Sequence, residues 1–145
     1  MAVEKMDVEA VVEGLNRALA LQRRSVLLYS LAGASTIGPL AAGIADRYEL
    51  FAGAELEDAG RLAAKLVSLG GEPTDDVAPL SWEEDAAGMI DVIADAEAEA
   101  LQALQKVIAP AGDEPEGEAL EHLLEHAIMR KQQQVDFLKR VRRGL

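Results

Sequence analysis

The sequence predicts an all-α protein, folded as an antiparallel four-helix bundle with left-handed packing. Alanine and leucine are abundant among the 145 residues, aromatic residues make up 3%, and long runs of β-branched residues are missing. Apolar residues recur at helical, roughly heptad spacing in four long segments, which is typical of helices packed in a left-handed bundle. We expect residues 1–145 to form one domain.

The first two helices have clear start and stop signals. Residues 8–33 are predicted to form the first helix, with Asp7 as its N-cap. A segment rich in glycine, serine and proline, residues 33–39, ends it. The second helix is predicted over residues 39–69 and stops at the Gly70-Gly71 pair.

The third and fourth helices follow a Pro/Asp-containing loop at residues 72–79. Ser81 and Glu84 match a capping box, which predicts a third helix over residues 82–109. Residues 110–115 break the chain, and a fourth helix is expected over 116–143. The connection after the second helix is short for two helices that lie parallel, so we expect irregular helix ends there.

Polar residues interrupt the apolar seam of every predicted helix near its middle. They are Gln22 in the first helix, Glu55 and Asp58 in the second, Glu97 in the third, and Lys131 and Gln134 in the fourth. Buried carboxylates cost several kcal/mol unless a partner compensates them, so these residues are expected to share one layer. Di-iron carboxylate bundles place their ligands in this way, with one or two from each helix.

Several short motifs resemble the ferritin-like superfamily, and bacterioferritin in particular. They are Leu15–Gln22, Tyr29, Glu55-Leu-Glu-Asp58-Ala59, Gly71-Glu-Pro73, Glu97 followed by Leu104 and Ile108, and Gln134-Val-Asp-Phe-Leu138. The resemblance covers most of the chain and implies the ferritin-like bundle. Tyr29, where the family keeps a tyrosine, is expected to be a core residue hydrogen-bonded to the polar layer.

The resemblance also implies that the di-iron site is degenerate. Glu55 and Glu97 keep the family's ligand type. Gln22 stands where the family has a terminal Glu, Asp58 and Gln134 where it has His, and Lys131 where it has a bridging Glu. Leu56 replaces the methionine that holds haem in bacterioferritins, so no haem is expected.

Three interpretations of the polar layer remain open, and the third is an intact two-metal ferroxidase centre. In the first, Lys131 replaces metal as a fixed cation paired with Glu55 and Glu97, and no cofactor binds. In the second, Glu55, Asp58 and Glu97 hold a single divalent ion of iron, manganese or zinc, because three carboxylates outnumber one ammonium.

The first interpretation predicts a structural or binding protein that has lost ferroxidase activity and is not an enzyme. The second predicts a reduced carboxylate site that still binds, oxidises or stores iron or another divalent metal.

The partners follow from charge and composition. A net charge of −12 argues against nucleic acid, and charges interrupt every apolar run, which argues against a membrane. The absence of cysteine excludes disulfides and thiolate sites. No secretory signal is evident, so a cytoplasmic protein is expected. The resemblance favours a homodimer or a higher homo-oligomer.

The only two histidines, His122 and His126, lie four residues apart in the fourth predicted helix. Glu118, Glu121 and Glu125 lie close to them in the sequence. The pair is either a pair of partly exposed side chains or a surface site for a divalent ion.

Overall fold

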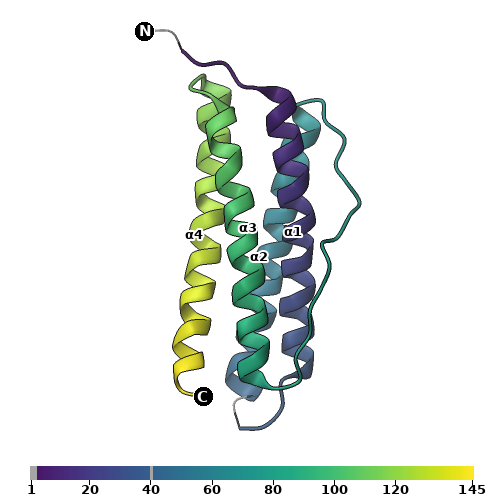
Figure 1. Ribbon diagram of the computed structural model, residues 1–145, viewed down its shortest axis with the longest axis vertical. Helices are drawn as coiled ribbons and strands as arrows, with labels where there is room; N and C mark the ends of the chain where they lie inside the picture. Colours follow the sequence, from purple (N-terminus) through teal and green to yellow (C-terminus); the bar gives the residue numbers. More distant parts are fainter. Residues whose placement is uncertain (1–2, 40) are drawn as a thin grey trace.

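The described residues of this computed structural model, 3–39 and 41–145, form four long helices and no strand. The helices are α1 (Val8–Ser35), α2 (Ala41–Ser68), α3 (Ala86–Ala111) and α4 (Pro115–Arg143). α1 and α4 run in one direction, and α2 and α3 run in the other (Figure 1). Each helix is therefore antiparallel to the two helices that it contacts, and the predicted all-α bundle is confirmed.

The ends of α1 and α2 follow the local sequence signals. The Asp7 carboxylate accepts a hydrogen bond from the amide of Ala10 at 3.1 Å, which confirms the predicted N-cap. After α2, Gly70 adopts a positive φ of 81°, a conformation that costs other residues free energy. The next amide, of Gly71, donates to the carbonyl oxygen of Leu66 at 2.9 Å and closes the helix end.

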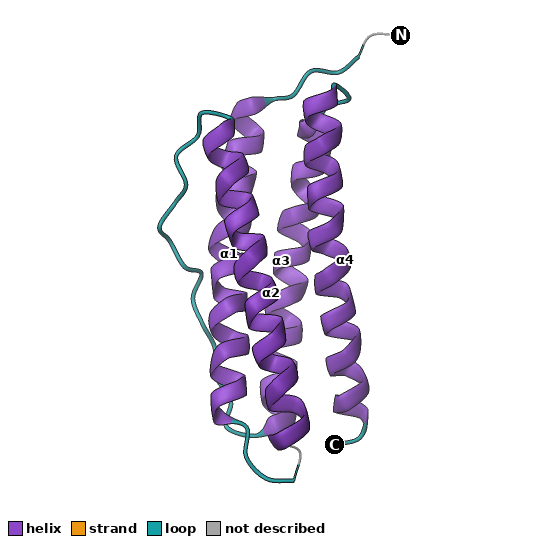
Figure 2. Cartoon of the chain, turned by 180° about the vertical axis from the view of Figure 1, so that it is seen from behind, coloured by secondary structure: helices purple, strands orange, loops and turns teal. Residues whose placement is uncertain are grey.

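The connection from α2 to α3, residues 69–85, runs along the length of the bundle beside α1 (Figures 1 and 2). The 28 residues of α2 extend about 42 Å. The twelve residues 70–81 would reach only roughly 40–43 Å when fully stretched. α3 accordingly begins later than predicted, with Asp85 as its N-cap, accepting from the amide of Gly88 at 2.7 Å. The capping box predicted at Ser81 and Glu84 is wrong.

Side chains of α1 fasten this long connection through its backbone. Asn16 donates to the carbonyl oxygen of Glu72 at 3.1 Å and accepts from the amide of Thr74 at 2.8 Å. Arg23 donates to the carbonyl oxygens of Thr74 and Asp76. Four backbone groups of this segment without helix or strand are thus bonded to side chains of one neighbouring helix.

The apolar core is divided into two clusters along the bundle. One cluster takes residues from 11–21 of α1, 59–66 of α2, 100–111 of α3 and 120–127 of α4. The other takes residues from 28–32, 44–48, 89–93 and Leu138. The segments between the two clusters carry the polar residues singled out in the sequence. Within the described part of the chain, no helix has an apolar stretch long enough to cross a membrane.

Candidate functional site

Seven buried polar side chains lie between the two apolar clusters, and we call them the polar layer. They are Gln22, Ser25, Glu55, Asp58, Glu97, Lys131 and Gln134, and none is more than 6% exposed. All six polar residues that the sequence placed on the inner seams belong to it. Every helix contributes at least one of them, because each seam has its polar interruption at the same height.

Lys131 lies at the centre of the polar layer and is fully buried. Its Nζ atom is 2.9 Å from Glu55 Oε2, and 3.1 and 3.2 Å from the two carboxylate oxygens of Glu97. It also donates to Ser25 Oγ at 3.1 Å. One ammonium therefore joins carboxylates from α2 and α3 from its own position on α4.

Three uncharged side chains of α1 donate hydrogen bonds to the same carboxylates. Gln22 Nε2 donates to Glu55 Oε2, and to the Glu55 carbonyl oxygen at 3.0 Å. Ser25 Oγ donates to Glu97 Oε1, and Tyr29 Oη donates to Glu97 Oε2 at 3.2 Å. The predicted hydrogen bond from Tyr29 to the polar layer is confirmed. Glu55 and Glu97 thus accept hydrogen bonds from α1 as well as from Lys131.

Asp58 has its own cationic partners at the edge of the layer. Arg130 of α4 donates through two nitrogens to both carboxylate oxygens, with Nε 3.0 Å from Oδ2. Arg61, one turn along α2, donates to Oδ1 at 2.8 Å. The three acids Glu55, Asp58 and Glu97 thus face three cations, so the charge surplus counted from the sequence does not exist.

The sequence interpretation missed Arg61, Arg130 and the role of Ser25. The i, i+3 spacing of Asp58 and Arg61 is a signal that could have identified one pair. Arg130 is 72 residues from Asp58, and its position next to Lys131 points to no particular partner.

Burial and charge shift the pKa values of the central groups. Burial raises the pKa of Glu55 to about 7, against the opposing effect of the Lys131 charge. Burial lowers the pKa of Lys131, but the negative charges of Glu97 and Glu55 outweigh this effect and leave it raised. Burial, and then the charge of Glu97, keep the pKa of Tyr29 well above its usual value. Lys131 is therefore firmly protonated, whereas Glu55 titrates near neutral pH.

The donor set of the polar layer does not fit a dinuclear metal centre. Protonated Lys131 has no lone pair, and it occupies the space between the two glutamates that a bridged ion pair would need. Both oxygens of Glu97 and of Asp58 already accept hydrogen bonds from side chains. Across residues 3–39 and 41–145, no three His, Asp or Glu side chains converge as ligands. Among the carboxylates that the structure describes, Glu55 Oε1 is the one buried oxygen without a partner.

Gln134 lies at an edge of the polar layer, where the layer meets a surface cleft. Its Oε1 atom is buried without a hydrogen-bond partner. The side chain lines a cleft of about 400 Å³ between α2 and α4, together with Arg47, Phe51, Phe137 and Arg140. Among the described side chains, Gln134 forms no hydrogen bond with Lys131 or with the carboxylates.

Three other residues considered in the sequence lie on the surface. Leu56 is 62% exposed on α2, at the side of an apolar groove, and its hydrocarbon side chain offers no ligand atom. His122 and His126 are both exposed on α4, away from the polar layer.

The comparisons with known proteins agree with this geometry. A ferritin-like domain model matches residues 12–144. A ferritin-like di-iron carboxylate protein from Bacillus anthracis is similar in structure, with 25% identity, a TM-score of 0.87, and 95% of this chain and 99% of that chain covered. No curated protein has significant sequence similarity to the chain.

Two bacterioferritin-related structures show the same fold. A dodecameric thioferritin from Bacteroides fragilis has 17% identity and a TM-score of 0.83, with 93% of this chain and 85% of that chain covered. The bacterioferritin of Rhodobacter capsulatus, described with haem iron and a metal-free dinuclear site, has 22% identity and a TM-score of 0.80, with 94% and 84% covered. By its sequence match, its helix order and its layer of polar core residues, the chain belongs to the ferritin-like domain family.

Proposed function

We propose that this protein is a ferritin-like bundle without di-iron ferroxidase activity, which acts as a structural or binding protein. The observation that carries the proposal is the position of Lys131, whose ammonium contacts both Glu55 and Glu97. The residues at three ligand positions of the family also support the proposal, because Gln22, Asp58 and Gln134 stand where the resemblance implies Glu, His and His. Gln22 donates a hydrogen bond to Glu55, whereas a glutamate at this position would offer a carboxylate to bind a metal.

Electrostatic repulsion explains why a cation and Lys131 exclude one another. A divalent ion held by Glu55 and Glu97 would lie within about 4 Å of the ammonium. At that distance the repulsion is roughly 8 kcal/mol for an effective dielectric constant of about 20. The raised pKa of Lys131 makes loss of its proton near neutral pH an unfavourable way to relieve that repulsion. The internal cation therefore satisfies the carboxylates that a metal would otherwise bind.

One observation favours the second candidate, a single divalent ion bound by a reduced carboxylate set. Glu55 Oε1 is buried without a partner, and burial raises the pKa of this residue to about 7. An ion at Glu55 would remove both features. It would also require Lys131 to leave its present position, and Asp58 to leave Arg130.

Iron binding and oxidation distinguish the two candidates. Two chains would be compared, and both would carry His122→Ala and His126→Ala to remove the surface imidazoles. The first keeps the native polar layer. The second has the family's ligand types, through Gln22→Glu, Asp58→His, Lys131→Glu and Gln134→His. Bound iron per chain, Fe(II) oxidation and the melting temperature with and without Mn(II) would be measured for each.

We expect no bound iron and no oxidation above buffer for the chain with the native polar layer. The variant with restored ligands is expected to gain thermal stability when Mn(II) is added, because metal would replace the missing cation. About one iron per native chain, or any oxidation above buffer, would overturn the proposal in favour of the second candidate.

Self-association is the binding role that the surface supports best. α1 and α2 share a groove of about 420 Å³ lined by apolar side chains, among them Leu19, Val26, Leu27 and Leu56. Its only charged member, Arg23, is bonded to backbone carbonyl oxygens of the long connection. A largely apolar groove suits a second copy of the same face, and the structurally similar B. fragilis protein is described as a dodecamer.

Light scattering after size exclusion would measure the mass of the wild type, of Leu56→Glu and of a matched control. Leu50→Glu is that control, since Leu50 is 64% exposed on the same helix but does not line the groove. We expect a dimer or larger assembly that only Leu56→Glu dissociates. A monomeric wild type, or equal dissociation by both variants, would exclude this interface.

A further inference from the structure

His122 and His126 form a close pair on the exposed side of α4. Their Nε2 atoms are 3.1 Å apart, and their rings are nearly perpendicular, with centroids 4.5 Å apart. Residues four apart lie one above the other on a helix, which brings both imidazoles to the same surface. The polar layer uses neither side chain.

The distance between the two nitrogens suits a single metal ion. An ion about 2.0–2.1 Å from each Nε2 atom would subtend roughly 95–100° between them. That angle lies between the 90° of square-planar or octahedral coordination and the 109° of tetrahedral coordination. The side chains thus reach the chelating distance without any change of rotamer.

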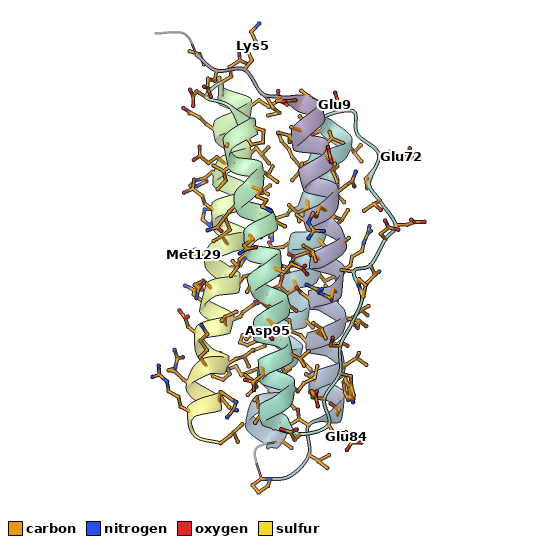
Figure 3. The ribbon with its side chains drawn as sticks, in the orientation of Figure 1. Lys5, Glu9, Glu72, Glu84, Asp95 and Met129 are labelled. Carbon is orange, nitrogen blue, oxygen red and sulfur yellow. The ribbon has the colours of Figure 1, made fainter. Side chains whose placement is uncertain are left out.

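The surroundings of the pair favour a cation. Glu118, Glu125 and Met129 fall with the two histidines in one arc of about 100° around α4. All five are exposed, and Met129 lies on the outer side of α4, away from the bundle (Figure 3). No lysine or arginine occurs between Pro115 and Met129. With a net charge of −12 on the whole chain, the local potential attracts divalent ions.

We propose that His122 and His126 form a surface chelate for a late first-row divalent ion, with Cu(II) bound more tightly than Ni(II) or Zn(II). Neutral imidazole is the usual ligand for these ions, and Cu(II) has the highest affinity in the series. Two protein nitrogens leave the remaining positions to water, so the ion is exchangeable. The site is independent of Lys131 and of the polar layer.

Protons compete with metal for the two nitrogens. Each Nε2 atom must be unprotonated to bind, so acidification releases the ion. A hydrogen bond between the two Nε2 atoms, with one imidazole as donor and the other as acceptor, also explains their separation of 3.1 Å. A hydrogen-bonded pair without metal affinity is therefore the alternative that the test must separate.

A composition-matched variant provides the control. The double change His126→Gln and Gln132→His keeps two histidines on α4 but separates them by ten residues, and Gln132 is exposed. Equilibrium dialysis of the tag-free chain against copper, nickel or zinc salts at pH 7.5 and pH 5.5 would measure affinity and stoichiometry. Circular dichroism would show that the wild type and the variant are equally folded.

We expect one ion per wild-type chain at pH 7.5, release at pH 5.5, and affinity about 100-fold weaker in the variant. The factor is the lower end of the gain expected when a second ligand belongs to the same scaffold. Equal binding by the wild type and the folded variant would overturn the proposal. So would the absence of a one-to-one complex in the wild type, which would leave only the hydrogen-bonded pair. An ion bound in the polar layer would add equally to both chains, so the difference between them reports on the histidine pair alone.

Discussion

Replacing Lys131 by methionine tests whether a buried cation stabilises the polar layer. Methionine keeps most of the alkyl volume, so the change removes the ammonium with little cavity. Both oxygens of Glu97 and one oxygen of Glu55 then lose their cationic partner in a site that is at most 1% exposed. Removing one partner of a buried ion pair costs about 3–5 kcal/mol.

The expected loss is large enough to measure by thermal unfolding. An unfolding entropy of about 2.1 cal/mol/K per residue gives roughly 0.3 kcal/mol/K for 145 residues. The melting temperature of Lys131→Met should therefore fall by about 10–16 °C at pH 7.5. The loss should shrink at acidic pH, because protonated carboxyl groups need no cation.

Two further variants give this experiment its controls. Lys139→Met removes an exposed lysine from the same helix and should change stability by less than about 0.5 kcal/mol. Adding Glu55→Gln and Glu97→Gln to Lys131→Met should restore most of the lost stability, because the layer then carries no unpaired charge. A loss below about 1 kcal/mol for Lys131→Met alone would refute the reasoning.

Three other predictions concern single side chains. Since burial raises the pKa of Glu55 from 4.5 to about 7, the folded chain keeps a proton that the unfolded chain loses, and stability should fall as the pH rises from about 5 to 7. Urea unfolding should show a decrease on the order of 3 kcal/mol that Glu55→Gln removes, and an unchanged pH profile would contradict this prediction. Arg130→Ala should cost about 1–2 kcal/mol, since it removes two bonds to a buried carboxylate, whereas Arg142→Ala, from an exposed pair, should cost less than about 0.5 kcal/mol in the same assay. Gly117→Ala should cost about 2–3 kcal/mol, because the added Cβ atom would lie 2.6 Å from the backbone carbonyl oxygen of Gly112. Gly53 has open space around it, so Gly53→Ala should stabilise α2 by roughly 0.5–1 kcal/mol. Equal melting temperatures for the two variants would disprove the packing argument.

The sequence predicted the parts of this structure that depend on local patterns. Four apolar seams and their polar interruptions identified the helices and most of the polar layer, because a helix repeats its inward face at fixed spacing. Asp7 and Gly70 marked helix ends through their own side-chain or backbone chemistry. The start of α3 depended instead on the distance that the preceding connection must cover, which no local motif records.

Side-chain partners across the bundle were also beyond local prediction. Asp58 was expected to add to an unbalanced negative charge, yet Arg130 reaches it from a helix that is distant in the sequence. Long arginine side chains have many rotamers, so sequence spacing alone does not choose their partner. The same limit hid the hydrogen bond from Ser25 to Glu97.

The long connection divides the chain into two helical hairpins, α1 with α2 and α3 with α4, that dock side by side. The nearest alternative alignment of their helical seams is a slide of one turn, about 5.4 Å. Such a slide would bring Ala127 or Val135 opposite Glu55 and separate Lys131 from Glu55, while Lys131 and Glu97 would move together. We infer that the pair of Lys131 and Glu55 selects the observed register of the two hairpins, a contribution to uniqueness that is separate from any contribution to stability.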